Sequence, residues 1–348
     1  VDAFRDSLYA MLKRNTFLNI KFENMLDTLG EMSRTDLYSY LKEWEQLTPL
    51  PFYSIGEPEL TKVVNKGGEE FFVLKVLVSN NSDYDGIIQM NVLQNGWWYQ
   101  PMEDPRARKK VEIAAHTSKE FVSVWEEQIR DVEINTMVSG NLPYMIRQSI
   151  GNVKQERNKI VKDTIYTLPE SSLEMPGEVI VDNEDSTLFV LSTPAVVGLL
   201  PKWLDKVEDT SFKYSGISWW RAPLQWTATT NAKYYGKYIR SAYVIKSGDG
   251  SQTATWKIPV PEAGQYELYY HVFKDDELRW NDRLQGEYHF RVAYDSEMED
   301  AYINLRKANE GWEQLGTYYF SADTVRVVLT DECKLRSVTA DAVKIVKR

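Results

Sequence analysis

Apolar residues recur every three or four positions along the first 48 residues. Phe4, Leu8 and Met11 follow this spacing, and the same period continues over residues 22–29. Such a period places the apolar side chains on one face of a helix. Helices that together span fewer than 50 residues bury little surface alone. We therefore expect residues 1–52 to be a helical segment that either packs on the next domain or is the remnant of a larger, truncated one.

A third helix is predicted shortly before this segment ends. Ser33 and Asp36 stand three residues apart in a capping-box pattern, and Leu37 and Trp44 lie on the apolar face that would follow. Pro49 ends the pattern, because proline cannot donate the backbone hydrogen bond that a helix needs.

From residue 57 onward the apolar period changes to two, which is typical of strands with one buried face. Residues 120–125 alternate most regularly, and we expect residues 132–136 to pair with them. Short strands at regular spacing favour an immunoglobulin-like β-sandwich over residues 53–160. The predicted strands of this part are 71–78, 86–92, 120–125 and 132–136.

A polar stretch over residues 152–163 indicates an exit from this domain, and we place a linker at 161–175. A second β-sandwich is expected over residues 176–348. Residues 186–213 interrupt its pattern and would be either an atypical insertion or a docking segment. The fold class is therefore mainly β, with two β-sandwiches after a short helical segment. The first strand of the second sandwich is expected within 177–185, and the others are 253–258, 266–272, 288–292, 316–320, 325–329 and 338–346.

Composition narrows the function classes. The 348 residues carry a formal net charge of −10, which disfavours nucleic acids and anionic membrane surfaces. The longest uncharged apolar run, near 194–201, is far too short to cross a bilayer. Cys333 is the single cysteine, so no intrachain disulfide and no paired-cysteine metal site can form.

Motifs of common hydrolases are missing. The sequence contains neither the His-Glu-x-x-His motif of zinc peptidases nor the Gly-x-Ser-x-Gly elbow of serine hydrolases. His116, His271 and His289 are scattered along the chain. We therefore expect no catalytic residue, although a paired-carboxylate glycosidase site cannot be recognised from spacing.

Several turns and strands of the second half occur in a recognisable order. They are Gly177 to Asp185, Gly248 to Ser251, Ala254 to Trp256, Pro261 to Tyr266, Gly311 to Gly316 and Ala340 to Val343. In this order they resemble the golvesin C-terminal-like domain, which also ends xanthan lyases, over residues 175–348. The resemblance implies a carbohydrate-binding β-sandwich of the golvesin or jelly-roll type.

Residues 1–160 show a looser resemblance. The stretch from Arg34 to Pro51, followed by 116–126 and 139–143, is similar to the end of the catalytic domain of a gluzincin zinc aminopeptidase and the sandwich after it. The zinc-binding helix would lie upstream of Val1. This resemblance implies an aminopeptidase-like parent protein whose catalytic motif is outside the chain.

Aromatic side chains crowd the stretch 203–243. Sugar rings stack on exposed aromatic side chains, while nearby amides and carboxylates bind their hydroxyl groups. Trp219 and Trp220 are the first candidates, because neighbours on a strand face opposite ways and one of them should leave the core. The competing explanation is that the aromatic side chains of this stretch are buried between sheets or between domains. The complete set of candidate ligand-binding residues is Trp219, Trp220, Trp280, Asn281, Asp282, Tyr234 and Tyr235. Trp312, by contrast, is expected to anchor the core.

Asp182, Asn183 and Asp185 would ligate a structural calcium ion through their side-chain oxygens. They lack the glycine and the distal glutamate of an EF-hand, so a solvated turn is the alternative. No other cofactor is expected.

These observations favour the non-catalytic C-terminal region of a larger exported bacterial protein. Its partners would be a polysaccharide or cell-surface glycan and the upstream domains of the parent protein. Its location would be extracellular, at the cell surface or periplasmic. Two alternatives stay open: a structural spacer or protein-interaction region of a peptidase-like protein, and a polysaccharide lyase similar to xanthan lyase.

Overall fold

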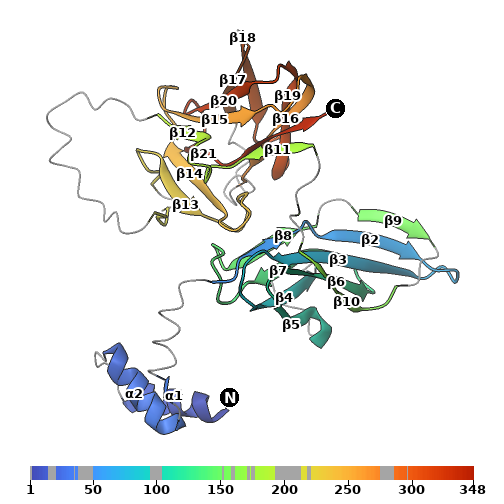
Figure 1. Cartoon of the computed structure of the whole chain (residues 1–348), viewed down its shortest axis with the longest axis vertical. Coiled ribbons are helices and arrows are strands. Elements are labelled where there is room, and N and C mark those ends of the chain that lie inside the picture. The colour runs from blue at the N-terminus through green and yellow to red at the C-terminus, as the bar shows by residue number, and fades with distance from the viewer. Residues whose placement is uncertain are drawn as a thin grey trace. The chain divides into compact units, whose positions relative to one another are not determined.

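The chain divides into two compact units, Val1–Leu50 and Pro51–Arg348. The computed structural model of the chain is shown in Figure 1. It describes residues 2–14, 21–34, 36–37, 50–94, 104–150, 153–157, 161–170, 173, 177–192, 213–217, 221–274, 286–295 and 297–348.

The described residues of the first unit form two helices, α1 (Asp2–Arg14) and α2 (Phe22–Ser33). Met11 of α1 and Leu26 and Leu29 of α2 are buried, in agreement with the predicted apolar face. Ser33 ends α2 instead of capping a third helix, because Arg34 adopts a left-handed conformation and its N–H bonds to Gly30 O. Most of the predicted third helix, including Trp44, lies outside the described residues.

The second unit begins with strands that form the first β region, residues 53–169. One sheet has the order β10-β6-β3-β2-β9, with β1 also paired to β3, and the other has the order β5-β4-β7-β8. The elements are β1 (Tyr53–Ile55), β2 (Glu59–Val64), β3 (Glu70–Asn80), β4 (Gly86–Gln94), a 3-10 turn (Pro105–Ala107), β5 (Arg108–Ile113), β6 (Thr117–Trp125), β7 (Ile129–Asn135), β8 (Met145–Ser149), β9 (Val153–Arg157) and β10 (Thr164–Pro169).

Side chains from both of these sheets form one hydrophobic cluster. Val76 and Val78 of β3 alternate into it, and they meet Ile88 and Met90 of β4. All four predicted strands are present, but one predicted pairing is wrong. β7 pairs with β4 and β8, whereas β6 pairs with β3 and β10.

The predicted polar exit and linker also contain strands. β9 lies within 152–163 and runs parallel to β2, and β10 lies within 161–175 and pairs with β6. A short polar strand such as β9 carries no clear alternation of apolar residues, so its pairing comes from register with a partner distant in sequence.

The second β region, residues 178–347, holds three sheets. Their orders are β11-β22-β16-β19, β12-β15-β20-β17-β18 and β13-β14-β21. The elements are β11 (Glu178–Val181), β12 (Phe189–Leu191), β13 (Thr227–Thr230), β14 (Ser241–Lys246), β15 (Thr253–Pro259), β16 (Gly264–Val272), β17 (Glu287–Tyr294), β18 (Glu297–Asn304), β19 (Gly311–Phe320), β20 (Thr324–Thr330), β21 (Ser337–Ala340) and β22 (Val343–Lys347).

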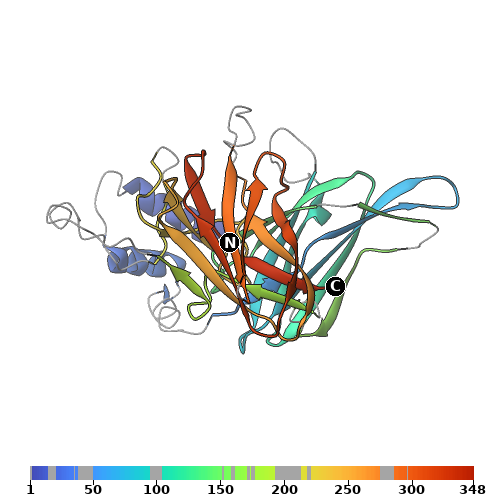
Figure 2. The ribbon, with the colours of Figure 1, turned by 90° about the horizontal axis from the view of Figure 1, so that it is seen from above.

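The three sheets of this region share a single core. Trp256, Tyr266 and Tyr270 are among its largest fully buried side chains. The predicted closing strand is divided into β21 and β22, which join different sheets on either side of Asp341. Figure 2 shows the strands of this region in yellow-green to red.

Among the described residues, a loop of the second β region contacts the first. The loop 231–240, between β13 and β14, forms an isolated parallel bridge from Ile239 to Leu142. Leu142 N donates to Tyr238 O at 3.0 Å, and Arg240 N donates to Leu142 O at 2.7 Å. The ring centroids of Phe52 and Tyr238 lie 5.3 Å apart. This contact ties the loop to the first β region by its backbone.

The described part of the chain is mainly β, as expected. No helix within it is long and apolar enough to cross a membrane.

Candidate functional site

The predicted ligand-binding residues fall into two groups. Trp219, Trp220, Trp280, Asn281 and Asp282 lie outside the described residues. Tyr234 and Tyr235 lie on the loop 231–240, where Tyr234 is buried and Tyr235 is partly exposed. Tyr234 is 4% exposed and packs on Phe273, with the ring centroids 4.7 Å apart. Its ring face is therefore closed to a ligand.

Tyr235 belongs to a group of three half-buried rings, which we call the aromatic cluster: Tyr235, His271 and Trp312. The Tyr235 ring centroid lies 5.8 Å from that of His271 and 5.1 Å from that of Trp312. His271 and Trp312 are 5.1 Å apart in an edge-to-face arrangement. Pairs of this kind are favourable contacts between aromatic rings.

Strand register explains why the aromatic cluster stands outside the core. His271 on β16 is the direct cross-strand partner of Trp312 on β19. Tyr270 and Val272, on either side of His271, are buried in the core. Because successive side chains of a strand point to opposite faces, His271 and Trp312 point away from it. The prediction that Trp312 anchors the core is therefore wrong.

A lysine on the neighbouring strand adds positive charge to the cluster. Lys344 Nζ of β22 lies 4.9 Å from the Trp312 ring centroid and 5.4 Å from that of Tyr269. It also pairs with Glu178 Oε1 at 2.9 Å. A cation over an aromatic face is attracted by the ring quadrupole, so Lys344 holds the Trp312 indole in place.

A buried carboxylate fixes the other side of the cluster. Asp341 is fully buried, its Oδ2 lies 2.8 Å from His271 Nδ1, and it accepts from Tyr235 N at 3.2 Å. Burial raises the pKa of Asp341, and the contact with His271 opposes that rise. Trp256 Nε1 donates to Asp341 O at 3.2 Å. One residue thus orients both Tyr235 and His271.

Two more charged groups accompany Asp341. Burial lowers the pKa of Arg240 to about 10, while Asp341 and Glu57 act in the opposite direction. Burial and the nearby charge of Asp341 raise the pKa of Asp182 well above its usual range. A buried acid whose pKa is raised holds its proton more readily, which lowers the electrostatic cost of placing two carboxyl groups together.

The predicted calcium ligands form a hydrogen-bonded turn after β11. Asp182 N donates to Asp185 Oδ2 at 2.9 Å, and Asn183 N donates to Asp182 Oδ1 at 2.7 Å. Asn183 is buried and contacts Ser241. No group of three or more histidine, cysteine, aspartate or glutamate side chains suited to a metal ion occurs among the described residues. The calcium site stays a prediction.

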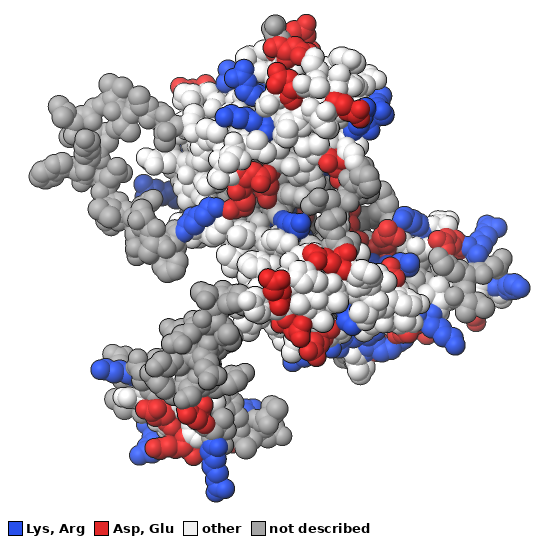
Figure 3. Space-filling model, viewed as in Figure 1, with Lys and Arg blue, Asp and Glu red and all other residues white. Residues whose placement is uncertain are grey.

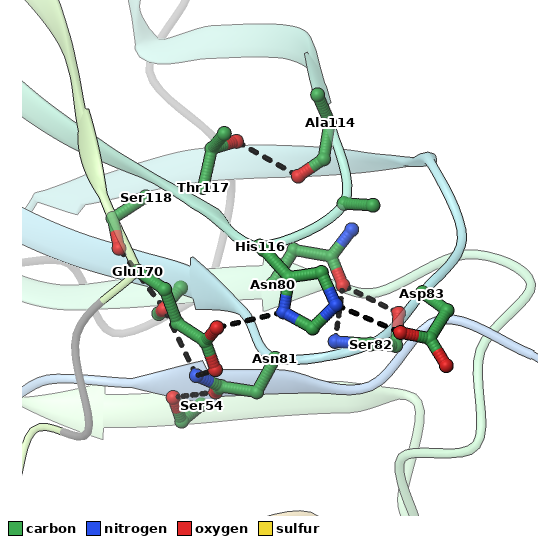
Figure 4. A network of polar contacts seen from close by, with 12 residues as sticks. Ser54, Asn80, Asn81, Ser82, Asp83, Ala114, His116, Thr117, Ser118 and Glu170 are labelled. Carbon is green, nitrogen blue, oxygen red and sulfur yellow. Dashed lines mark hydrogen bonds and ion pairs between the residues drawn. The ribbon is translucent and has the colours of Figure 1, made fainter.

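The first β region carries a separate polar network around His116 (Figure 4). His116 Nδ1 lies 2.7 Å from Glu170 Oε2, and Nε2 lies 2.8 Å from Asp83 Oδ1. Both hydrogen bonds raise the pKa of His116. Asn81 Nδ2 donates to Glu170 Oε1 at 2.8 Å. A histidine with a carboxylate at each ring nitrogen is best paired in its doubly protonated, cationic form.

Acidic and basic side chains are interspersed on the face shown in Figure 3. Lys and Arg (blue) and Asp and Glu (red) are separated there by uncharged surface (white).

The aromatic cluster was missed from the sequence because its residues come from three separated segments. The alternation of the strands gives a sign of it. His271 follows the buried Tyr270 directly, so it must lie on the opposite face of its strand, and Trp312 also lies outside the buried positions of its strand. Comparison with known families bears on the same segment.

Residues 219–347 match the family model of the golvesin C-terminal domain. The resemblance predicted for the second half is confirmed over this golvesin-like region, which starts later than the expected residue 175. It contains the aromatic cluster and Asp341. The resemblance of residues 1–160 to zinc aminopeptidases finds no support.

Two solved structures illustrate what else the chain is similar to. A xanthan lyase of Paenibacillus is 18% identical, with a TM-score of 0.34, over 86% of this chain and 27% of that chain. A β-glucuronidase of Bacteroides uniformis is 12% identical, with a TM-score of 0.22, over 91% of this chain and 32% of that chain. No curated protein matches the chain.

Proposed function

We propose that the golvesin-like region binds a polysaccharide, and that the aromatic cluster is part of its binding surface. The observation that carries the proposal is the group of half-buried rings on the outer side of β16 and β19, held by Asp341 and Lys344. Function is argued from this group because a fold alone does not determine it.

The chemistry of the cluster suits a sugar. Tyr235 and Trp312 offer apolar ring surface, and the nearby Lys344 and His271 side chains can bind hydroxyl or carboxylate groups. A binding surface gains affinity when its side chains are held in place before the ligand arrives. Asp341 supplies that order, since it accepts from the Tyr235 backbone and contacts His271.

The proposal extends to the architecture and setting. The first β region would be an immunoglobulin-like β-sandwich and residues 176–348 a golvesin or jelly-roll-like one. The chain would be a non-catalytic part of an extracellular, cell-surface or periplasmic protein, joined to upstream domains. Trp219, Trp220, Trp280, Asn281 and Asp282 would extend the binding surface, and the turn at 182–185 would hold a structural calcium ion.

A glycan array probed with the whole chain tests the function. We expect selective binding of polysaccharide fragments, weakened about tenfold or more by Trp312→Ala, a loss of roughly 1.4 kcal/mol. Trp312→Phe should retain part of the affinity because it keeps an apolar ring. The double variant Trp219→Ala, Trp220→Ala asks whether the predicted tryptophans contribute as well.

Tyr319→Ala is the matched control. Tyr319 is 65% exposed and lies on the same strand as Trp312, seven positions away. Its removal should leave glycan binding unchanged. If folded wild-type protein binds nothing on the array, the proposal is wrong.

A structural role is the second candidate. The bridge from Leu142 to Ile239 favours it, because backbone hydrogen bonds connect the two β regions at this point. In that case the chain would position neighbouring domains, and both the Trp312→Ala and the wild-type protein would fail to bind glycans while remaining folded.

A further inference from the structure

We propose a second sugar-binding site on β17 and β18, centred on Tyr302, that takes a neutral sugar ring. The choice of a sugar as its ligand rests on the proposed function. Its residues are different, however, and it lies on a different sheet from the aromatic cluster.

The side chain of Tyr302 is exposed to solvent, although it lies within a strand. It is 57% exposed, whereas its neighbours Ala301 and Ile303 are buried in the core. The alternation of strand side chains therefore turns the Tyr302 ring to the side of the sheet away from the core. β18 is the last strand in the order β12-β15-β20-β17-β18, so Tyr302 also stands at the edge of the sheet.

One side of the Tyr302 ring is already supported. His289 on β17 is its direct cross-strand partner, and the two rings stack with centroids 5.0 Å apart and planes 11° from parallel. His289 is itself held, since its Nε2 lies 2.8 Å from Asp300 Oδ1 and its Nδ1 lies 3.4 Å from Glu332 Oε2. The supported ring can meet a ligand with little loss of side-chain freedom.

Polar groups of both kinds surround the stacked pair. Asp300 and Glu332 are more than half exposed and offer carboxylate oxygens as acceptors. Arg291 lies two positions from His289 on the same face and directly opposite Asp300. Its Nε is buried and has no hydrogen-bond partner among the described residues. Hydroxyl groups can both donate to the carboxylates and accept from a guanidinium.

The charged groups around Tyr302 favour an uncharged sugar over an acidic one. Asp300 and Glu332 carry two negative charges, against one positive charge on Arg291. A sugar that carries its own carboxylate would therefore be repelled. Like charges brought together at an interface act against binding. An uncharged ring with an apolar face for Tyr302 and hydroxyls at its rim meets no such penalty. The geometry therefore points to neutral hexose units.

NMR titration of the whole chain tests this site. The probes are cellohexaose, maltohexaose and mannohexaose as neutral oligosaccharides, and an oligogalacturonate as the acidic counterpart. We expect at least one neutral probe to shift the amide signals of β17 and β18. Tyr302→Ala should weaken that probe about tenfold or more, and Tyr302→Phe should bind within about threefold of wild type, because the stacking ring is retained.

Two controls separate this site from the aromatic cluster. Tyr319→Ala, an exposed tyrosine on another sheet, should bind like wild type, and Trp312→Ala should keep the shifts at β17 and β18. The second site is refuted if no neutral probe shifts these strands in folded protein, if the oligogalacturonate binds there more tightly, or if Tyr302→Ala binds like wild type. Loss of binding in Trp312→Ala with normal binding in Tyr302→Ala would retain the proposed function and reject this second site.

Discussion

Asn141 shows how much one side chain can hold together. Its Oδ1 accepts from Tyr53 N at 2.9 Å, and its Nδ2 donates to Tyr53 O at 2.7 Å. The same Nδ2 lies 3.3 Å from Tyr238 O on the loop of the second β region. The amide thus completes the backbone pairing of a fully buried residue, as a neighbouring strand would.

Asn141→Ala should lower the free energy of unfolding by roughly 2–3 kcal/mol, because the N–H and C=O groups of Tyr53 lose their partner in a buried place. Urea unfolding of the variant and the wild type measures the change. Asn309→Ala, at an exposed asparagine, should change it by less than about 0.5 kcal/mol. Equal unfolding midpoints for Asn141→Ala and wild type would contradict the buried pairing.

His116 should make stability depend on pH. Its pKa is raised by its hydrogen bonds to Asp83 and Glu170, and the pKa of Glu170 is lowered by Asn81 and His116. The His116 contribution is complete below its unfolded pKa of roughly 6.5 and is lost as pH rises through the raised folded value. The Glu170 contribution is present above its unfolded pKa of roughly 4.3 and is lost as pH falls.

His116→Asn should remove the loss of stability that sets in as pH rises above roughly 6.5. Asparagine suits this substitution because His116 has a φ of 51°, a left-handed conformation that asparagine tolerates. Chemical unfolding between pH 5.5 and 8.5 measures the slope. An unchanged slope in the variant would show that other groups set the pH dependence.

At the scale of elements, the loop 231–240 is held by contacts to both β regions. It carries Tyr235 toward Asp341 and Tyr238 toward the first β region. Gly236 lies between them with a φ of 153°. A Cβ placed there would come within 1.9 Å of Ile239 O, a backbone atom that has no freedom to move aside.

Gly236→Ala should therefore distort the loop, lower stability by at least about 2 kcal/mol, and weaken glycan binding through Tyr235. Thermal unfolding and the glycan titration measure the two effects. Gly216→Ala is the matched control, since a Cβ at Gly216 meets no atom within 4 Å. Normal stability of Gly236→Ala would contradict the described loop.

Elements were also where prediction from sequence succeeded most. The alternating stretches that became β3, β6, β15, β16 and β20 were visible, because burial of one face leaves a period of two. β18 was missed, since Glu297–Asp300 is exposed on both faces and only Ala301 and Ile303 reach the core. Tyr302, which stands between them, was missed with it.

At the scale of the whole molecule, the sequence identified a mainly β chain with a golvesin-like region, but not the arrangement of its sheets. The pairing of β7 with β4 and the parallel contact of β9 with β2 join segments far apart in the chain. Such pairings depend on register and on the surfaces available for burial, which local periodicity does not encode. The aromatic cluster eluded prediction for the same reason.

The bridge between Leu142 and Ile239 has a practical consequence for dissecting the protein. A fragment that starts at residue 176 keeps every strand of the golvesin-like region but loses Leu142, Asn141 and Phe52. The backbone groups of Tyr238 and Arg240 would then face water, on the loop that also carries Tyr235. A fragment spanning residues 51–348 keeps these partners, and is the one in which ligand affinity should be compared with that of the whole chain.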